Sequence, residues 1–208
     1  MVIVTGINAY KDEADAYFNI EKAANTMKVK PTRKTYKRPT LTAAKTFTIK
    51  TTNAKGEVTY QLNSAAKNAG FKVSSAGVVT VPKNCKVGKN YQIRVRAAGD
   101  DNYKAKNVLV TVRVIKVANT MKATVTQQTY LKKELKEPAS FDIGVTEAKG
   151  KVTYTAAASA KAVGITVTSK GKVTVPAKCK RGHYRIRVKA AGNGSYRAKT
   201  IFVKVTVK

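Results

Sequence analysis

The residues closest to a nucleophile and base are Cys179 and His183, four positions apart. A thiol becomes a nucleophile when an adjacent base takes its proton and a third group orients that base. His183 is the only histidine in the chain, and a closely similar stretch earlier in the sequence has Lys89 and Asn90 at that place. A local pair found in only one of two similar stretches does not suit catalysis, so we predict a protein that is not an enzyme and has no catalytic residues.

A second group of residues has the oxygen atoms that calcium prefers. Asp100, Asp101 and Asn102 follow one another in a loop, and calcium sites are built from carboxylate and amide oxygens. The similar loop near the end of the chain has Asn193 and Ser195 and no carboxylate. We therefore predict turn residues, no metal and no cofactor. Because these five residues differ between the two loops, they remain candidates for contacting a ligand at the loop tips.

Basic residues at alternate positions form a third candidate group. Side chains two positions apart lie on one face of a β-strand, so an alternating row presents its charges together. Such a row fits wall teichoic acid, a sulfated glycan or an acidic host protein through charge-assisted hydrogen bonds; the alternative is a solvated sheet face. The row consists of Arg94, Arg96, Arg185, Arg187 and Lys189, extended by Arg113 and Lys204 from the following strands.

The net charge of +30 is spread over most of the 208 residues. Residues 1–22 hold four acids and two lysines, whereas 23–116 carry a net +17 and 117–208 a net +15. Such a charge favours polyanions and keeps a chain soluble. Nucleic acid is not the expected partner, because readout needs a groove-reading element or a stacking platform and the tyrosines recur at core-like positions. No run approaches the ~18 apolar residues of a membrane helix, so we expect no membrane insertion.

The sequence repeats itself with an offset of 94 residues, and of 93 after the cysteine. Ala-Asn-Thr-Met-Lys occurs at 24–28 and again at 118–122, and Gly-x-Val-Thr-Val-Pro occurs at 77–82 and 171–176. We predict one domain over 23–116 and a second over 117–208. Residues 1–22 then form the two-strand C-terminal remnant of a preceding repeat. This hairpin is too small to be stable alone, so we expect residues 2–20 to dock on the first domain or to pair with another chain.

Alternating apolar residues predict short strands throughout both repeats. Valines at 108, 110, 112 and 114 form one such row, and Ile201 begins the matching row in the second repeat. Six to eight short strands in about 93 residues predict an all-β fold of two tandem antiparallel Ig-like β-sandwiches. The alanine-rich segments 63–69 and 156–162 predict short helical turns. Cys85 and Cys179 hold equivalent positions, so we expect two small buried residues and no disulfide.

The junction 114–122 contains no glycine, serine or proline, which predicts a semi-rigid connection and a monomeric rod within a longer chain. The loops Ala-Ala-Gly-Asp-Asp-Asn-Tyr-Lys-Ala at 97–105 and Ala-Ala-Gly-Asn-Gly-Ser-Tyr-Arg-Ala at 190–198 resemble those of the tandem bacterial Ig-like or cadherin-like repeats of Gram-positive surface and secreted proteins. That resemblance implies an extracellular module at the bacterial cell surface or in a secreted protein. We expect a non-catalytic stalk or spacer. The alternatives are an adhesin module that binds a host protein such as an immunoglobulin or an anionic glycan, and accessory domains of a large secreted hydrolase.

Overall fold

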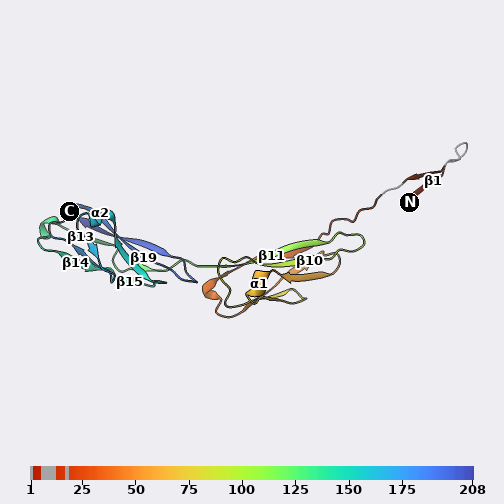
Figure 1. Ribbon diagram of the computed structural model, residues 1–208, viewed down its shortest axis with the longest axis horizontal. Helices are drawn as coiled ribbons and strands as arrows, with labels where there is room; N and C mark the ends of the chain where they lie inside the picture. The colour runs from red at the N-terminus through yellow and green to blue at the C-terminus, as the bar shows by residue number, and fades with distance from the viewer. Residues whose placement is uncertain (1, 6–12, 17–18) are drawn as a thin grey trace. The chain divides into compact units, whose positions relative to one another are not determined.

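The computed structural model describes residues 2–5, 13–16 and 19–208, with side chains from residue 19 onward. The regular secondary structure of the described residues is almost entirely β-strand, as predicted (Figure 1). The strands before residue 116 are β1 (Val2–Thr5), β2 (Glu13–Ala16), β3 (Lys28–Lys30), β4 (Arg33–Lys37), β5 (Lys45–Thr48), β6 (Lys50–Thr52), β7 (Val58–Leu62), β8 (Lys72–Val73), β9 (Val78–Val81), β10 (Tyr91–Ala97) and β11 (Lys106–Ile115). The later strands are β12 (Lys122–Ala123), β13 (Gln127–Tyr130), β14 (Ala139–Asp142), β15 (Val145–Thr146), β16 (Val152–Ala156), β17 (Thr166–Val167), β18 (Lys172–Val175), β19 (Gly182–Ala190) and β20 (Lys199–Val207).

The strands of each repeat form the same set of sheets. In the first repeat a four-stranded sheet has the order β4-β11-β10-β7, a three-stranded sheet the order β5-β9-β8, and β3 pairs with β6. In the second repeat the corresponding orders are β13-β20-β19-β16, β14-β18-β17 and β12-β15. Among the described residues every pairing joins strands of one repeat. The two repeats are therefore tandem β-sandwiches, and the boundaries at 22/23 and 116/117 remain predictions.

Most strand pairs are antiparallel, as predicted, but the first strand of the large sheet is not. β13 runs parallel to β20, with Gln127 opposite Lys204 and Tyr130 opposite Val207. Parallel neighbours need a long connection, and here almost the whole repeat lies between the two strands. Nothing local in the sequence signals a pairing at that separation, which is why an all-antiparallel sandwich was predicted.

The hairpin predicted before the first repeat is present in the described part of that segment. β1 and β2 pair antiparallel, with Val2 opposite Ala16 and Thr5 opposite Glu13. The sequence also predicts a final strand over residues 13–20; β2 covers Glu13–Ala16, and Asn19 and Ile20 lie outside any strand. The glycine-to-tyrosine loop at 6–10 lies outside the described residues. Docking of this hairpin, or its pairing with another chain, stays a prediction.

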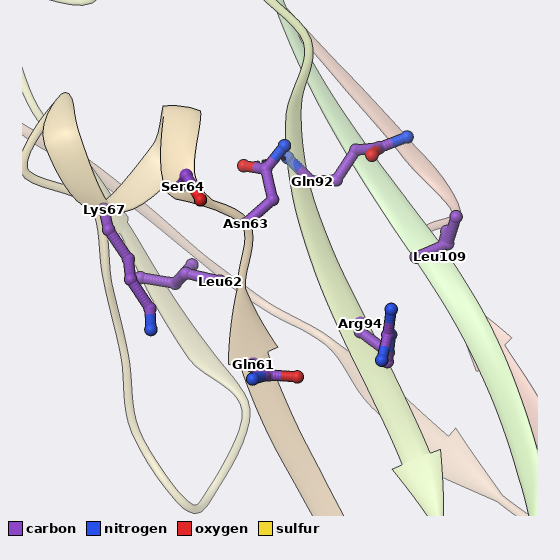
Figure 2. A pocket seen from close by; sticks show the side chains of 8 residues that line it. All are labelled: Gln61, Leu62, Asn63, Ser64, Lys67, Gln92, Arg94 and Leu109. Atoms are coloured by element: carbon purple, nitrogen blue, oxygen red, sulfur yellow. Dashed lines mark hydrogen bonds between the residues drawn. The ribbon is translucent and has the colours of Figure 1, made fainter.

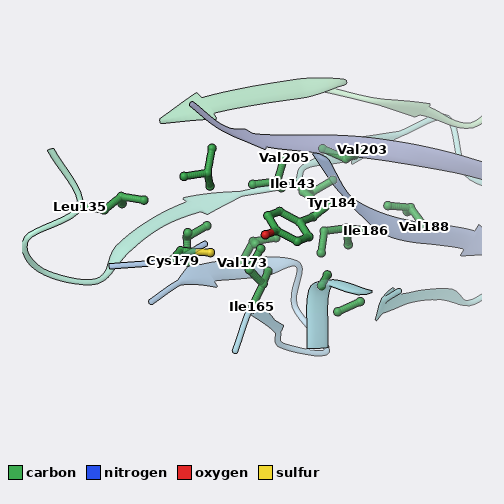
Figure 3. Packing of buried hydrophobic residues seen from close by; sticks show 14 of the residues in the cluster. Leu135, Ile143, Ile165, Val173, Cys179, Tyr184, Ile186, Val188, Val203 and Val205 are labelled. Carbon is green, nitrogen blue, oxygen red and sulfur yellow. The ribbon is translucent and has the colours of Figure 1, made fainter. Parts of the chain in front are cut away.

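The core of the second repeat is aliphatic and closely follows the alternation of the sequence. Tyr184, Ile186 and Val188 of β19 face inward, next to Val203 and Val205 of β20 (Figure 3). Val173 of β18, in the smaller sheet, completes the cluster together with Ile143 and Ile165, which lie next to β14 and β17. Each such side chain contributes about 1.5–3 kcal/mol when fully buried. This burial determines which residues of β19 and β20 must point outward.

The two alanine-rich segments form short helices, as predicted. They are α1 (Ser64–Asn68) and α2 (Ala158–Lys161), and each buries one alanine, Ala66 or Ala160. The side chain of Asn63 caps α1 by accepting a hydrogen bond from the backbone N–H of Ala66 at 2.9 Å. Two 3-10 turns, η1 (Arg38–Thr40) and η2 (Lys132–Glu134), occupy matching places in the two repeats.

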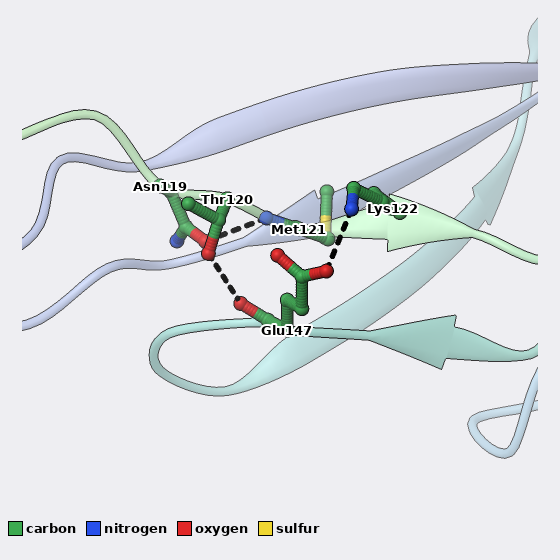
Figure 4. A network of polar contacts seen from close by, with 5 residues as sticks. All are labelled: Asn119, Thr120, Met121, Lys122 and Glu147. Carbon is green, nitrogen blue, oxygen red and sulfur yellow. Dashed lines mark hydrogen bonds and ion pairs between the residues drawn. The ribbon is translucent and has the colours of Figure 1, made fainter.

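A buried asparagine fixes the segment by which the chain enters each repeat. Asn119 is only 4% exposed. Its side-chain oxygen accepts a hydrogen bond from the backbone N–H of Met121 at 3.2 Å (Figure 4). The same oxygen accepts from the backbone N–H of Lys149 at 3.1 Å, and the side-chain amide donates to the carbonyl of Lys149 at 2.8 Å. Asn25 makes the same contacts with Met27 and Lys55 in the first repeat. The Ala-Asn-Thr-Met segments are thus bound to the repeat that follows them.

The loop held by this asparagine approaches a second loop so closely that only glycine fits. Gly150 has a φ of +89°, and a Cβ added there would collide with the carbonyl of Gly192. Gly56 and Gly99 form the equivalent contact in the first repeat. These glycines recur because two backbones meet without room for side chains.

We predict that Asn119→Ala lowers the free energy of unfolding of the second repeat by about 2 kcal/mol or more, because buried backbone groups lose their partners. The measurement is urea denaturation of the full chain. Thr120→Ala is the matched control, since Thr120 donates one exposed hydrogen bond to the carbonyl of Glu147 and its loss should cost under about 1 kcal/mol. Equal effects of the two substitutions would show that the buried asparagine does not hold this segment.

Candidate functional site

The predicted basic row of the first repeat lies on the outer face of the large sheet. Tyr91, Ile93 and Val95 of β10 are buried, so the residues between them face solvent. Arg94 and Arg96 are accordingly exposed, as is Arg113 on the neighbouring strand β11. The alternation read from the sequence therefore placed these three side chains correctly.

The second repeat presents a denser basic face. Arg185, Arg187 and Lys189 are exposed along β19, between the buried residues of that strand. Lys204 of β20 is exposed and stands directly opposite Arg185 in the antiparallel register. Like charges directly opposite each other repel by a few tenths of a kcal/mol or more. None of the four strands of this sheet contains an acidic residue.

The basic faces of the two repeats are not copies of each other. With the offset of 93 residues, Arg94 corresponds to Arg187 and Arg96 to Lys189. Arg185, however, corresponds to Gln92, and Lys204 corresponds to Thr111. The two additional cations, Arg185 and Lys204, lie opposite each other in the N-terminal half of β19 and its partner strand. They occur only in the second repeat.

The sequence analysis missed two exposed apolar residues on these faces. Leu109 on β11 is 50% exposed and Phe202 on β20 is 54% exposed. The two occupy equivalent positions, each one residue away from the inward-facing row of its strand. The signal was available, because the inward row at 201, 203, 205 and 207 requires residue 202 to face outward. The guanidinium of Arg185 lies 6.0 Å from the ring centre of Phe202.

Each of these apolar residues lines a shallow hollow. In the first repeat the hollow measures about 390 Å³, and Leu109, Gln92 and Arg94 line it together with residues at the start of α1 (Figure 2). In the second repeat it measures about 520 Å³ and is lined by His183, Tyr184, Arg185, Phe202 and Lys204. The two hollows therefore lie on corresponding faces of the equivalent sheets of the two repeats.

The predicted loop-tip residues mainly shape their loops. The carboxylate of Asp100 accepts hydrogen bonds from the backbone N–H groups of Asn102 and Tyr103, both at 2.9 Å. Asn193 does the same for Ser195 and Tyr196. A side chain engaged with its own loop in this way forms an Asx-turn. Asp101 is exposed beside Asp100. Within the described residues, no three His, Cys, Asp or Glu side chains gather as a metal site would require.

The loop tips also receive the entry segments through their backbones. The carbonyl of Ser195 accepts a hydrogen bond from the N–H of Val117 at 3.0 Å, and Arg197 donates to the carbonyl of Val117 at 2.8 Å. In the first repeat, Ala23 donates to Asn102 and accepts from Lys104. The loops regarded as ligand-contact candidates thus hold the chain where it enters each repeat. Contact of these loops with a ligand remains a prediction.

Cys179 and His183 are engaged separately. The imidazole of His183 lies 3.1 Å from the hydroxyl of Thr206, across the pairing of β19 with β20. Cys179 is buried, and its thiol approaches the carbonyl of Lys180 at 3.8 Å. Burial raises the pKa of the Cys179 thiol, which disfavours the thiolate that nucleophilic attack requires. Both cysteines are free and buried, as predicted.

We predict that neither thiol of the native chain reacts with a disulfide reagent at pH 8. Burial raises the pKa of the Cys85 thiol to about 11, although the charge of Arg38 opposes that rise. At pH 8 roughly one Cys85 thiol in a thousand is then a thiolate, and it is not accessible. Release of the coloured thiol product should be negligible for the native chain and should reach two equivalents in denaturant.

The same pKa shift has a consequence for stability. The thiol of the unfolded chain ionises near 9.0 and that of the folded chain near 11. Stability from the neutral buried thiol is therefore complete below pH 9 and is lost as the pH rises toward 11. In the labelling experiment with the disulfide reagent, rapid reaction of the native chain at pH 8 would contradict the buried environment of both cysteines.

Comparisons with known proteins identify neither a family nor a curated relative. No model of a protein family matches the sequence, and no curated protein matches it. Many solved structures show some similarity. They include three extracellular domains of Drosophila N-cadherin (14% identity, TM-score 0.35), for which the match covers 85% of this chain and 63% of that one. Mouse protocadherin-24 EC1-3 shares 14% identity (TM-score 0.35), with 98% of this chain and 77% of that chain covered.

A third solved structure is the D00-D0 domain of intimin, at 16% identity and a TM-score of 0.33, with 85% of this chain and 97% of that chain covered. Of the N-cadherin fragment, by contrast, the chain spans less than two thirds. The strand pairings within each repeat define the β-sandwich fold. Among the described residues, no helix is both long and apolar enough to cross a membrane.

Proposed function

We propose that this chain is a non-catalytic stalk or spacer, formed of tandem β-sandwiches, in a bacterial cell-surface or secreted protein. Its role is mechanical: it holds a functional part of a longer protein at a distance and transmits tension. The observation that supports this most directly is the parallel pairing of β13 with β20.

This pairing puts the two ends of the second repeat in a shear geometry. The chain enters β13 at Gln127, opposite Lys204, and leaves β20 after Val207, opposite Tyr130. Tension between the ends of the repeat pulls β13 toward its start and β20 toward its end. Because hydrogen bonds between strands lie across the strand direction, the bonds of this pair bear such tension together and not one after another.

Backbone hydrogen bonds continue at both ends of this pairing. Lys204 donates to the carbonyl of Thr126 at 3.0 Å, and Lys208 donates to that of Tyr130 at 2.9 Å. Lys132 donates to the carbonyl of Lys208 at 2.7 Å. In the first repeat, Thr111 donates to the carbonyl of Thr32 at 2.9 Å, which is the equivalent of the bond from Lys204. β4 correspondingly lies beside β11.

The charge of the chain suits the same role. A surface with a net charge of +30 is attracted to a polyanion such as a teichoic acid, so a spacer of this kind would remain associated with an anionic wall. A second candidate function, binding of an anionic glycan, is favoured by the hollow around Phe202. Accessory domains of a secreted hydrolase remain an alternative that no residue of the site favours.

We predict that Gln128→Pro weakens the second repeat under force, whereas Thr129→Pro does not. Thr126 bonds to Lys204 of β20, and Tyr130 and Lys132 bond to Lys208 directly after it. In a ladder of alternating contacts, residue 128 therefore bonds to β20 as well. Proline at 128 removes a donor in that ladder. The N–H of Thr129 points away from β20 at a sheet edge, where proline is tolerated. The measurement is single-molecule force spectroscopy of the full chain held at its termini.

The expected rise in the forced-unfolding rate for Gln128→Pro is about tenfold, because one lost hydrogen bond is worth about 1–1.5 kcal/mol. Ile165→Val serves as a further control: it removes buried volume next to β17, away from the β13–β20 pair, and lowers thermal stability, with a smaller effect on the unfolding force. A stalk role would be contradicted if the native chain unfolded at the force of Gln128→Pro. The same conclusion would follow if Ile165→Val reduced that force as much as Gln128→Pro.

A further inference from the structure

The hollow around Phe202 combines three features that do not occur together in the first repeat. A large aromatic side chain is 54% exposed in the middle of a sheet face. Two cations, Arg185 and Lys204, stand opposite each other beside it. The hollow of about 520 Å³ is open to solvent and includes all three residues. The equivalent residues of the first repeat are Leu109, Gln92 and Thr111.

Among the described residues, no ion pair involves Arg185 or Lys204. The ion pairs found among the described residues join Lys104 with Glu21 and Lys122 with Glu147. The four acids of residues 117–208 all lie outside the strands of the large sheet. The repulsion between Arg185 and Lys204 is therefore not relieved within the sheet, and an anion bound between them would relieve it.

We propose that the Phe202 hollow binds a carboxylated polysaccharide, with one hexuronate residue seated in it. The apolar face of the pyranose ring packs on Phe202, and the carboxylate accepts hydrogen bonds from Arg185 and Lys204. Hydrogen bonds between such ionised groups are about twice as strong as neutral ones. This binding activity is separate from the mechanical role and does not depend on it.

The distance between the aromatic ring and the cation selects this class of ligand. The guanidinium carbon of Arg185 is 6.0 Å from the ring centre of Phe202. A ligand that contacts both must carry an apolar ring face and an acidic group within one residue. A hexuronate does so, because its carboxylate is attached directly to the sugar ring. A polyol phosphate chain has the anion and no ring, and a neutral sugar has the ring and no anion.

A second copy of the chain is a poorer occupant for this face. Two such faces would bring Arg185, Arg187, Lys189 and Lys204 of each copy together with no acid in either sheet. The repulsion would oppose association. Among the described residues, the second repeat exposes two large apolar side chains, Leu131 and Phe202, which is far from the area that stable protein interfaces bury.

The test is calorimetric titration of the full chain with an oligomer of galacturonic acid, at low and at physiological salt. Arg185→Gln, Lys204→Thr and Phe202→Leu each introduce the residue that the first repeat has at that place, so the fold tolerates them. We expect each to weaken binding by about tenfold. The matched controls are Arg94→Gln, which removes one charge from the same face of the first repeat, and Leu109→Ala; both should bind within twofold of the native chain.

Three comparison ligands separate the sources of affinity. A neutral galactose oligomer of equal length should not bind measurably, and polyphosphate should bind in a way that Phe202→Leu leaves unchanged. A sulfated glycan should bind more weakly than the uronate at equal charge. The proposal is overturned if Arg94→Gln weakens uronate binding as much as Arg185→Gln does, because binding would then follow net charge alone. It is also overturned if Phe202→Leu has no effect, or if Phe202→Leu converts a dimer into a monomer in sedimentation.

Discussion

The last strand of each repeat occupies the position on which the other elements depend. β20 lies between β19 and the entry strand β13, and its inward side chains fill the core beneath. Its register with β19 runs over nine residue pairs, from Gly182 opposite Val207 to Ala190 opposite Lys199. One strand therefore closes the hydrophobic core, sets the outward row that includes Phe202 and Lys204, and joins the end of the repeat to its beginning.

The core explains why the outer face is available for function. Burial of Ile186 and Val188 requires the residues between them to face solvent, whatever their type. The inward rows are nearly the same in the two repeats, because they must fill similar space. The outward positions are free of that requirement, and there the repeats differ: Gln92 against Arg185, Leu109 against Phe202 and Thr111 against Lys204. Two domains of one fold thus present different chemistry on corresponding faces.

Features with a local signature could be predicted from the sequence. Alternation identified the buried rows and the outward arginines, alanine content identified α1 and α2, and equivalent positions identified two buried cysteines. Features that depend on distant residues could not. The parallel pairing of β13 with β20 joins residues 77 apart, and the role of Asn119 depends on backbone groups of Lys149. Phe202 was within reach of the same alternation, but its place beside Arg185 required the register of β19 with β20.

The pairing of the entry strand β13 with the last strand β20 is the contact on which the shear geometry depends. Amide hydrogen exchange measured by NMR tests this pairing directly. The amides of Lys204 and Lys132, which donate across this pairing, should be protected as strongly as that of Val205, which faces β19. The amides of Gln127 and Thr129, on the open side of β13, should exchange rapidly. If Val205 were protected while Lys204 and Lys132 exchanged as fast as in an unfolded chain, the entry strand would not be paired and the account would be wrong.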